Sequence, residues 1–200
     1  MISSILLAAG CSSRMEGENK LVKEINGIPL IKHAVKNILG SSVDEIIVVL
    51  GYEKDVLENL IGINKKIKFV YNVDFKNGIA SSIKIGIKNI SNRADAFFIT
   101  LGDMPNINQN IYNKLIKARF NYNKKVKLEH KKEFIIPTFE GKNGNPVLIS
   151  KYAKGKINKI KGDIGAKEII ELNKNNSLYI PVKSNGVTLD FDYLEDFNSL

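Results

Sequence analysis

The chain has 200 residues, of which 44% are hydrophobic and 26% charged, an ordinary composition for a globular protein. This length suits one domain with a substantial core, and we expect residues 1–200 to form a single domain. The net charge is +9, but the basic residues are spread out and their densest cluster, residues 124–132, lacks interleaved aromatic residues. We therefore expect no nucleic-acid partner.

Membrane spans, signal peptides and cysteine patterns can also be judged from the sequence. No apolar run approaches the roughly 18 residues of a membrane span, and the short first run lacks the cationic start of a signal peptide. We therefore expect a cytoplasmic protein with no membrane partner. The single cysteine, Cys11, excludes an internal disulfide and a cysteine-based zinc cluster.

The first apolar run, residues 2–7, predicts a buried strand, and an unusual turn follows it. This turn, LAAGCSSRM at residues 7–15, begins with small residues that allow a ligand close to the backbone and present N–H groups. Arg14 offers a planar fork for phosphate oxygens, and Lys20 adds a point charge. The pattern indicates a site for a nucleoside triphosphate, although a flexible turn with two solvated cations is the plainer alternative.

Apolar runs and helical patterns then alternate, which predicts an α/β fold with a mostly parallel central sheet. The expected elements are a helix from Pro29 to about Leu39, a strand Glu45–Leu50, a helix over residues 55–61, a strand Ile67–Tyr71, a helix beginning near Gly78 and a strand Ala96–Leu101. Ser81 and Ser82 fall in the first turn of the helix after Gly78. There they would either cap the helix or help to bind a ligand at its positive end.

Asp103 follows the strand Ala96–Leu101 at once, in the sequence GDMP. In an open α/β sheet, ligands bind at the carboxyl ends of the strands. A carboxylate oxygen there suits Mg²⁺ held against nucleotide phosphates, and a simple turn is the alternative.

The second half is less regular. We expect an amphipathic helix through Ile107, Ile111, Leu115 and Ala118, followed by a polar surface loop over residues 121–133. A strand is expected over residues 133–139, and Pro137 places it near a sheet edge. The remaining expected elements are a turn at 141–146, a strand over 147–149, a helix ending near Leu172, a strand Ser177–Pro181 and a terminal helix. Asp163 would serve as the N-cap of the helix that ends near Leu172. Asp190 and Asp192 share one face of an extended tail, as a solvated rim or a cation site.

Six collinear motifs resemble one family over nearly the whole chain, the molybdenum cofactor cytidylyltransferases and their close relatives. They are LAAGCSSRM with Lys20, NGIASSI (77–83), LGDMP (101–105), GKNGNPVLI (141–149), GDIGAK (162–167) and LDFDYLEDF (189–197). The resemblance implies a Rossmann-like nucleotidyltransferase fold with helices on both faces of the sheet. It also implies Mg²⁺-dependent transfer of CMP from CTP to molybdopterin, with release of pyrophosphate, for a partner molybdenum hydroxylase.

The resemblance also implies roles for individual residues. The nucleotide would lie against Leu7, Ala8, Ala9 and Gly10, and its triphosphate would contact Arg14 and Lys20. The base or ribose would lie near Gly78, Ser81 and Ser82, and the acceptor would be surrounded by Gly144, Asn145 and Pro146. Asp103 and Asp192 would hold Mg²⁺. Arg14, Lys20 and Asp103 would be the catalytic residues.

The sequence departs from the family pattern at three places. Asn145 stands where these enzymes more often have histidine, Tyr193 and Leu194 replace Thr-Pro in the tail, and Glu16 interrupts the usual Met-Gly pair. Three alternatives stay open: a molybdopterin guanylyltransferase, a sugar- or polyol-phosphate nucleotidyltransferase of the same fold, and a non-catalytic molybdopterin carrier. In each case we expect a monomer.

Overall fold

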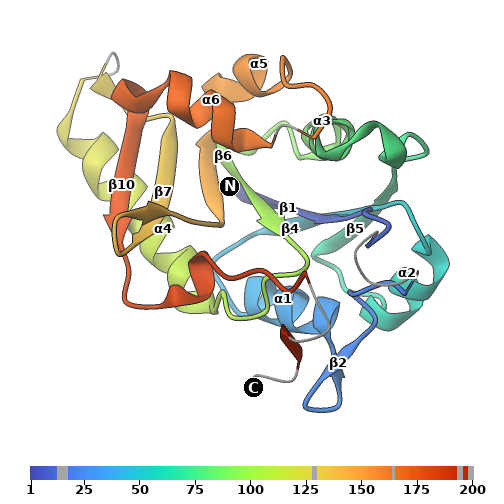
Figure 1. Ribbon diagram of the computed structural model, residues 1–200. Helices are drawn as coiled ribbons and strands as arrows, with labels where there is room; N and C mark the ends of the chain where they lie inside the picture. Colours follow the sequence, from blue (N-terminus) through green and yellow to red (C-terminus); the bar gives the residue numbers. More distant parts are fainter. Residues whose placement is uncertain (13–17, 128–129, 164, 193–195, 198–200) are drawn as a thin grey trace.

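The computed structural model describes residues 1–12, 18–127, 130–163, 165–192 and 196–197 (Figure 1). The strands are β1 (Ile2–Ala8), β2 (Glu24–Ile25), β3 (Ile28–Pro29), β4 (Glu45–Leu50), β5 (Ile67–Tyr71), β6 (Ala96–Leu101), β7 (Phe134–Phe139), β8 (Lys142–Asn143), β9 (Val147–Ser150) and β10 (Ser177–Pro181). The α-helices are α1 (Leu30–Leu39), α2 (Lys54–Ile61), α3 (Ile79–Asn89), α4 (Gln109–Lys125), α5 (Lys154–Ile157) and α6 (Ala166–Leu172). Short 3₁₀ turns are η1 (Phe75–Asn77), η3 (Lys151–Ala153), η4 (Lys174–Asn176) and η5 (Asn185–Val187).

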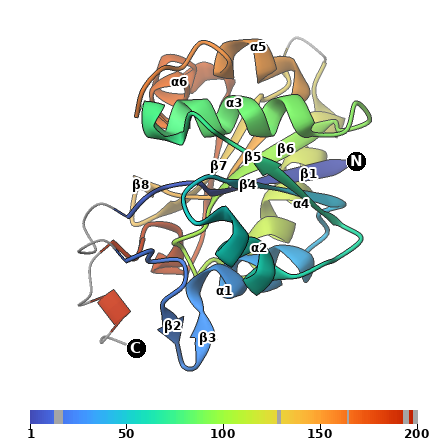
Figure 2. The ribbon, with the colours of Figure 1, turned by 90° about the vertical axis from the view of Figure 1, so that its right-hand side faces the viewer.

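One large sheet runs through the described chain in the order β10-β7-β9-β6-β1-β4-β5, with β8 paired to β7. The pairs β6–β1, β1–β4, β4–β5 and β7–β10 are parallel, and β9 is antiparallel to both of its neighbours. Figure 2 shows α3, α5 and α6 over one face of this sheet and α1, α2 and α4 over the other. The expected α/β fold with a mostly parallel sheet covered on both faces is confirmed.

The alternating side chains of β1 divide the core into two layers. Ile5 points into the layer under α3, whereas Leu6 points into the layer that holds α1 and α4, and both are fully buried. Because both faces of the inner strands are covered, these strands are continuous apolar runs, which is why β4 and β6 were predictable from sequence. The sheet thus forms a rigid platform whose strand ends carry the loops.

Helix α4 is longer than expected. It begins at Gln109, where the side chain of Asn108 accepts a hydrogen bond from the backbone N–H of Asn110, so Ile107 lies before the helix. It then continues to Lys125, which makes the prediction of a loop over residues 121–133 wrong in its first part. The segment holds no glycine or proline that would end the helix earlier.

Pro137 lies near a sheet edge as expected, because β7 is the second strand from that edge, between the outermost strand β10 and β9. The strand tolerates proline there because β9 pairs only with Phe134 and Ile135, so the missing N–H falls beyond the end of that ladder. The carbonyl of Pro137 is still used, accepting a hydrogen bond from the N–H of Gly144 at 2.8 Å. The expected terminal helix falls largely on residues outside those described.

Candidate functional site

A cavity of about 500 Å³ opens where β1 and β6 end. Its walls come from the loop after β1, the start of α3, the loop after β6 and the tail that follows η5. It therefore lies at the carboxyl edge of parallel strands, where ligands bind in open α/β sheets. The described residues that line it are Leu7, Ala8, Ala9, Gly10, Cys11, Ser12, Lys20, Leu21, Phe75, Lys76, Gly78, Ile79, Ser82, Leu101, Gly102, Asp103, Asp163 and Asp192.

The loop after β1 is shaped by small residues. Ala9 is buried against Gly51, where any Cβ would lie only 2.7 Å from the Ala9 carbonyl oxygen, whereas Gly10 is exposed with open space around it. Ser12, a residue that the sequence reasoning did not single out, accepts a hydrogen bond from the backbone N–H of Lys20 at 3.0 Å. This bond holds Ser12 and Lys20 together, and both residues line the cavity. Arg14 lies outside the described residues.

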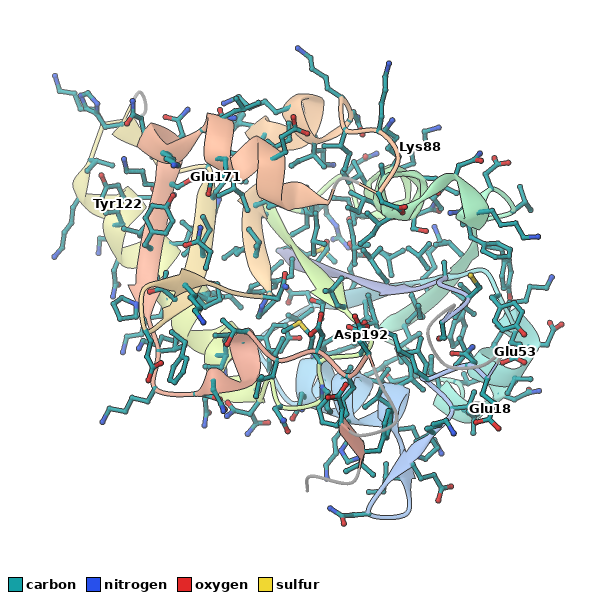
Figure 3. The ribbon with its side chains drawn as sticks, in the orientation of Figure 1. Glu18, Glu53, Lys88, Tyr122, Glu171 and Asp192 are labelled. Atoms are coloured by element: carbon teal, nitrogen blue, oxygen red, sulfur yellow. The ribbon has the colours of Figure 1, made fainter. Side chains whose placement is uncertain are left out.

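Lys20, Asp103 and Asp192 meet at the edge of this cavity. The Lys20 Nζ lies 2.5 Å from Asp103 Oδ2 and 2.5 Å from Asp192 Oδ1, and the three side chains are 15%, 18% and 23% exposed. Figure 3 shows Asp192 just beyond the tip of β6. The backbone N–H of Phe191 donates to the Asp103 carbonyl at 2.9 Å, which fastens the tail to the loop after β6.

In this cluster, the one ammonium of Lys20 faces the two carboxylates of Asp103 and Asp192. Burial raises the pKa of Asp103; Lys20 opposes the rise and Asp190 and Asp192 add to it, so the pKa stays above its ordinary value. Burial acts to lower the pKa of Lys20, but the two carboxylates outweigh burial and hold that pKa above its ordinary value. The cluster therefore favours additional positive charge.

The donor set fits a divalent cation with few protein ligands. Asp103 Oδ1 is buried and has no hydrogen-bond partner among the described residues. In the part of the chain that the structure describes, no group of three or more His, Cys, Asp or Glu side chains is placed to hold a metal ion. Two carboxylates with nucleotide phosphates are the usual surroundings of Mg²⁺ in nucleotide sites.

The start of α3 is covered by a distant segment. Gly78 has a φ of +91°, and a Cβ there would lie 2.4 Å from the carbonyl carbon of Gly162. The N–H of Ala80 donates to the Gly162 carbonyl at 3.0 Å, and the N–H of Ile79 donates to Asp163 Oδ1 at 3.3 Å. Asp163 thus lines the cavity and does not cap α6, whose N-cap is Gly165 without a side-chain hydrogen bond.

The two serines of α3 do not cap the helix either, because its N-cap is Gly78. Asn72 Nδ2 donates to the hydroxyl oxygens of both Ser81 and Ser82 at 2.8 Å. Ser82 is buried and lines the cavity, whereas Ser81 donates to the Gly78 carbonyl at 2.8 Å and is not among the residues that line it. The capping alternative is wrong, and Ser82 is the better placed of the pair for a ligand.

A second cavity of about 220 Å³ adjoins the first, with Ile79 and Leu101 lining both. Gly144 and Asn145 line this second cavity, while Pro146 is buried and is not among the lining residues. The N–H of Asn145 donates to the Val187 carbonyl at 2.7 Å. The predicted acceptor residues thus lie beside the predicted nucleotide residues.

Comparison with known proteins gives a consistent result. The family model described as "MobA-like NTP transferase domain" matches residues 4–178. The molybdenum cofactor cytidylyltransferase of Escherichia coli is 29% identical over 150 residues, which is 75% of this chain and 70% of that protein.

Solved structures share the fold. Rv0371c from Mycobacterium tuberculosis superposes with a TM-score of 0.82 at 19% identity, covering 98% of this chain and 95% of that one. Its manganese complex gives a TM-score of 0.78 at 17% identity and covers 98% and 96%. A nucleotidyl transferase from Methanothermobacter gives 0.80 at 20% identity and covers 99% and 94%. The expected Rossmann-like nucleotidyltransferase fold is confirmed, and none of the described helices is long and apolar enough to cross a membrane.

Proposed function

Because this chain belongs to the family of MobA-like NTP transferase domains, we propose that it transfers CMP from CTP to a molybdopterin-type acceptor. The observation that carries the proposal is the meeting of Lys20, Asp103 and Asp192 at a cavity bordered by the small residues after β1. The cytidylyl and molybdopterin assignments rest on the motif pattern and on the similarity to the cytidylyltransferase of Escherichia coli.

In this proposal the first cavity takes CTP. Leu7, Ala8, Ala9 and Gly10 border it with backbone and small side chains, which lets the nucleotide approach closely. Ser82, beside the start of α3, suits a contact with the ribose or base, with Gly78 next to it. Arg14 and Lys20 serve the triphosphate in this reading.

Asp103 and Asp192 would hold Mg²⁺, which neutralises phosphate charge when bound. The unpartnered Asp103 Oδ1 supports this assignment. The ammonium of Lys20 now contacts both carboxylates. When another cation neutralises them, Lys20 becomes available to contact phosphate oxygens.

The second cavity would take the acceptor. Its walls are mainly apolar, which suits a flat ring system, and Asn145 supplies one polar side chain. Its shared walls with the first cavity, Ile79 and Leu101, would bring the acceptor phosphate toward the nucleotide.

The reaction is a phosphoryl-group displacement. An oxygen of the acceptor phosphate forms a bond to the α-phosphorus of CTP, the bond from that phosphorus to the bridging oxygen breaks, and pyrophosphate leaves with the electron pair. The acceptor oxygen is already anionic, so no general base is needed. Catalysis then consists of positioning and charge stabilisation, and Lys20 and Arg14 would stabilise the charge that develops on pyrophosphate.

Isotope position tests this directly. With molybdopterin and Mg²⁺, label from [α-³²P]CTP should appear in the dinucleotide product, and label from [γ-³²P]CTP should appear only in pyrophosphate. Transfer from GTP and not from CTP would assign the guanylyl reaction instead. Nucleotide and molybdopterin binding without any transfer would contradict the enzymatic proposal and favour a carrier that supplies an apo molybdenum hydroxylase.

A further inference from the structure

A third cavity, of about 680 Å³, lies at the opposite edge of the sheet. Asp95 precedes β6, Glu133 precedes β7 and Asn176 precedes β10, while Ser150 ends the antiparallel β9. All four therefore lie at the amino edge of the parallel strands. The proposed reaction takes place at the carboxyl edge and makes no use of this cavity.

The lining of this cavity is strongly basic. Its described residues include five cations, Arg119, Lys124, Lys131, Lys132 and Lys151, and two carboxylates, Asp95 and Glu133. Five cations around one concave site raise the local concentration of anions.

Both carboxylates of this cavity already face cations of the protein. Asp95 lies 3.0 Å from the N-terminal ammonium and 3.5 Å from Lys151 Nζ, and Glu133 pairs with Lys156, which is not among the lining residues. The excess of cations is therefore left to attract an external anion.

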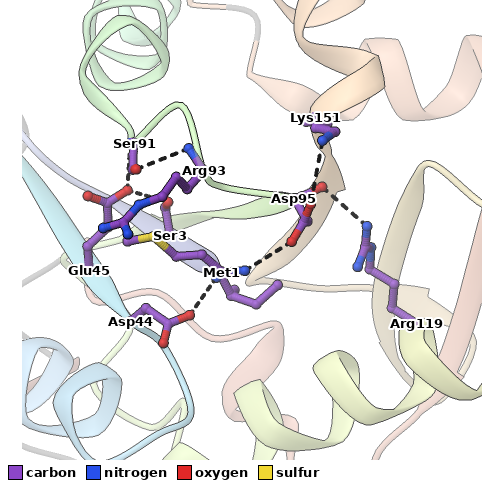
Figure 4. A network of polar contacts seen from close by, with 10 residues as sticks. Met1, Ser3, Asp44, Glu45, Ser91, Arg93, Asp95, Arg119 and Lys151 are labelled. Atoms are coloured by element: carbon purple, nitrogen blue, oxygen red, sulfur yellow. Dashed lines mark hydrogen bonds and ion pairs between the residues drawn. The ribbon is translucent and has the colours of Figure 1, made fainter.

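Arg119 is a half-buried cation of this cavity. Figure 4 shows its guanidinium pointing toward Asp95, whose backbone carbonyl accepts a hydrogen bond from it at 3.2 Å. Its Nε is buried without a hydrogen-bond partner among the described residues. Burial lowers the pKa of Arg119, with Asp95 opposing, so this guanidinium is partly desolvated and gains from a nearby anion.

Two exposed aromatic rings complete the lining. Phe120 is 63% exposed and Tyr152 is 68% exposed, and both line the cavity. Aromatic side chains exposed beside cations are the combination that stacks on a base while its phosphates are neutralised. The volume also falls within the range of roughly 300–1,000 Å³ seen for small-molecule sites.

We propose that this cavity is a second nucleotide site, which binds a nucleoside phosphate through the Arg119 and lysine cations and stacks its base on Phe120 or Tyr152. The described carboxylates of this cavity, Asp95 and Glu133, are both paired with cations of the protein, so the proposal concerns binding of the ligand and not its reaction. The inference goes beyond the proposed transfer reaction and does not depend on it.

Backbone amide NMR of the whole chain, titrated with ADP in the absence of divalent cations, separates the two sites. Shifts should appear at residues 119–124, 131–133 and 150–152. Shifts confined to residues 7–12, 20 and 78–82 would overturn the proposal, as would no shift at all.

Charge and stacking can then be separated with variants. The double variant Lys124→Gln/Lys131→Gln should weaken ADP binding at this cavity at least tenfold, whereas the control Lys65→Gln/Lys117→Gln, at exposed lysines outside it, should change it less than twofold. Phe120→Ala with Tyr152→Ala should weaken ADP binding but not binding of inorganic phosphate. Equal affinities for ADP and inorganic phosphate in the unmodified chain would overturn the nucleotide assignment.

Discussion

Lys20 is the residue on which the candidate site depends most. It contacts two carboxylates that would otherwise repel each other, and all three groups are mostly buried. The same ammonium has two functions in our account. It stabilises the nucleotide-free chain, and it contacts phosphate once another cation neutralises the carboxylates.

Lys20→Met tests the first of these functions. It leaves Asp103 buried without its cation, so we expect the free energy of unfolding to fall by about 1–3 kcal/mol. Mn²⁺ or Mg²⁺ should then raise the melting temperature of this variant more than that of the unmodified chain, because the ion replaces the lost charge. Equal metal-induced shifts in thermal unfolding would contradict the assignment of the two carboxylates as metal ligands.

Asp103→Asn tests the metal assignment through turnover. The amide cannot supply the anionic ligand, so kcat should fall roughly 100-fold or more while the chain still folds. Asp190→Asn is the matched control, since Asp190 is exposed and affects Asp103 only through its charge. If both variants retained wild-type kcat in Mg²⁺, Asp103 would not be a catalytic ligand.

At the scale of elements, most of the fold could be predicted because buried parallel strands have simple patterns. The range Glu45–Leu50 is a strand in both prediction and structure, since both faces of β4 are covered. Pro137 correctly indicated a strand near the sheet edge, but β7 is not itself the outermost strand, and the proline fits there because the ladder with β9 ends before it. The outcome at such positions depends on the neighbouring strand, which a single sequence does not reveal.

The candidate site was predictable where its residues follow strands. Asp103 comes directly after β6, so its position at the carboxyl edge follows from the fold class. Asp163 was different, because its hydrogen bond reaches α3, 84 residues earlier in the chain. No local signal distinguishes such a long-range contact from a cap of the next helix.

Gly78→Ala tests the contact between α3 and the segment around Gly162. The new Cβ would collide with the Gly162 backbone and also carries the strain of a positive φ, so CTP affinity should fall together with stability. Gly62→Ala is the matched control, with a φ of +75° and open space around it. It should lose about 1 kcal/mol of stability but bind CTP normally. Normal CTP binding by Gly78→Ala would remove this segment from the account of the nucleotide site.

At the scale of the whole molecule, one sheet joins the two halves of the chain. Strands from the first hundred residues, such as β1, lie in the same sheet as β10. Each of the two hydrophobic layers contains residues from both halves, Leu6 with Val187 in one and Ile5 with Ile170 in the other. This arrangement is the physical basis for proposing a single domain.

The single-domain proposal predicts cooperative unfolding. Calorimetry should show one transition whose calorimetric and van't Hoff enthalpies agree, and far-UV and near-UV signals should change together in urea. Two separable transitions would contradict it.

The most direct test of the account is pyrophosphate release by the purified protein with Mg²⁺ and molybdopterin, compared among CTP, GTP, ATP and UTP. We predict release with CTP that depends on the acceptor and on Mg²⁺. The absence of release with all four nucleotides, from a protein that binds CTP and molybdopterin, would contradict the proposed cytidylyltransferase.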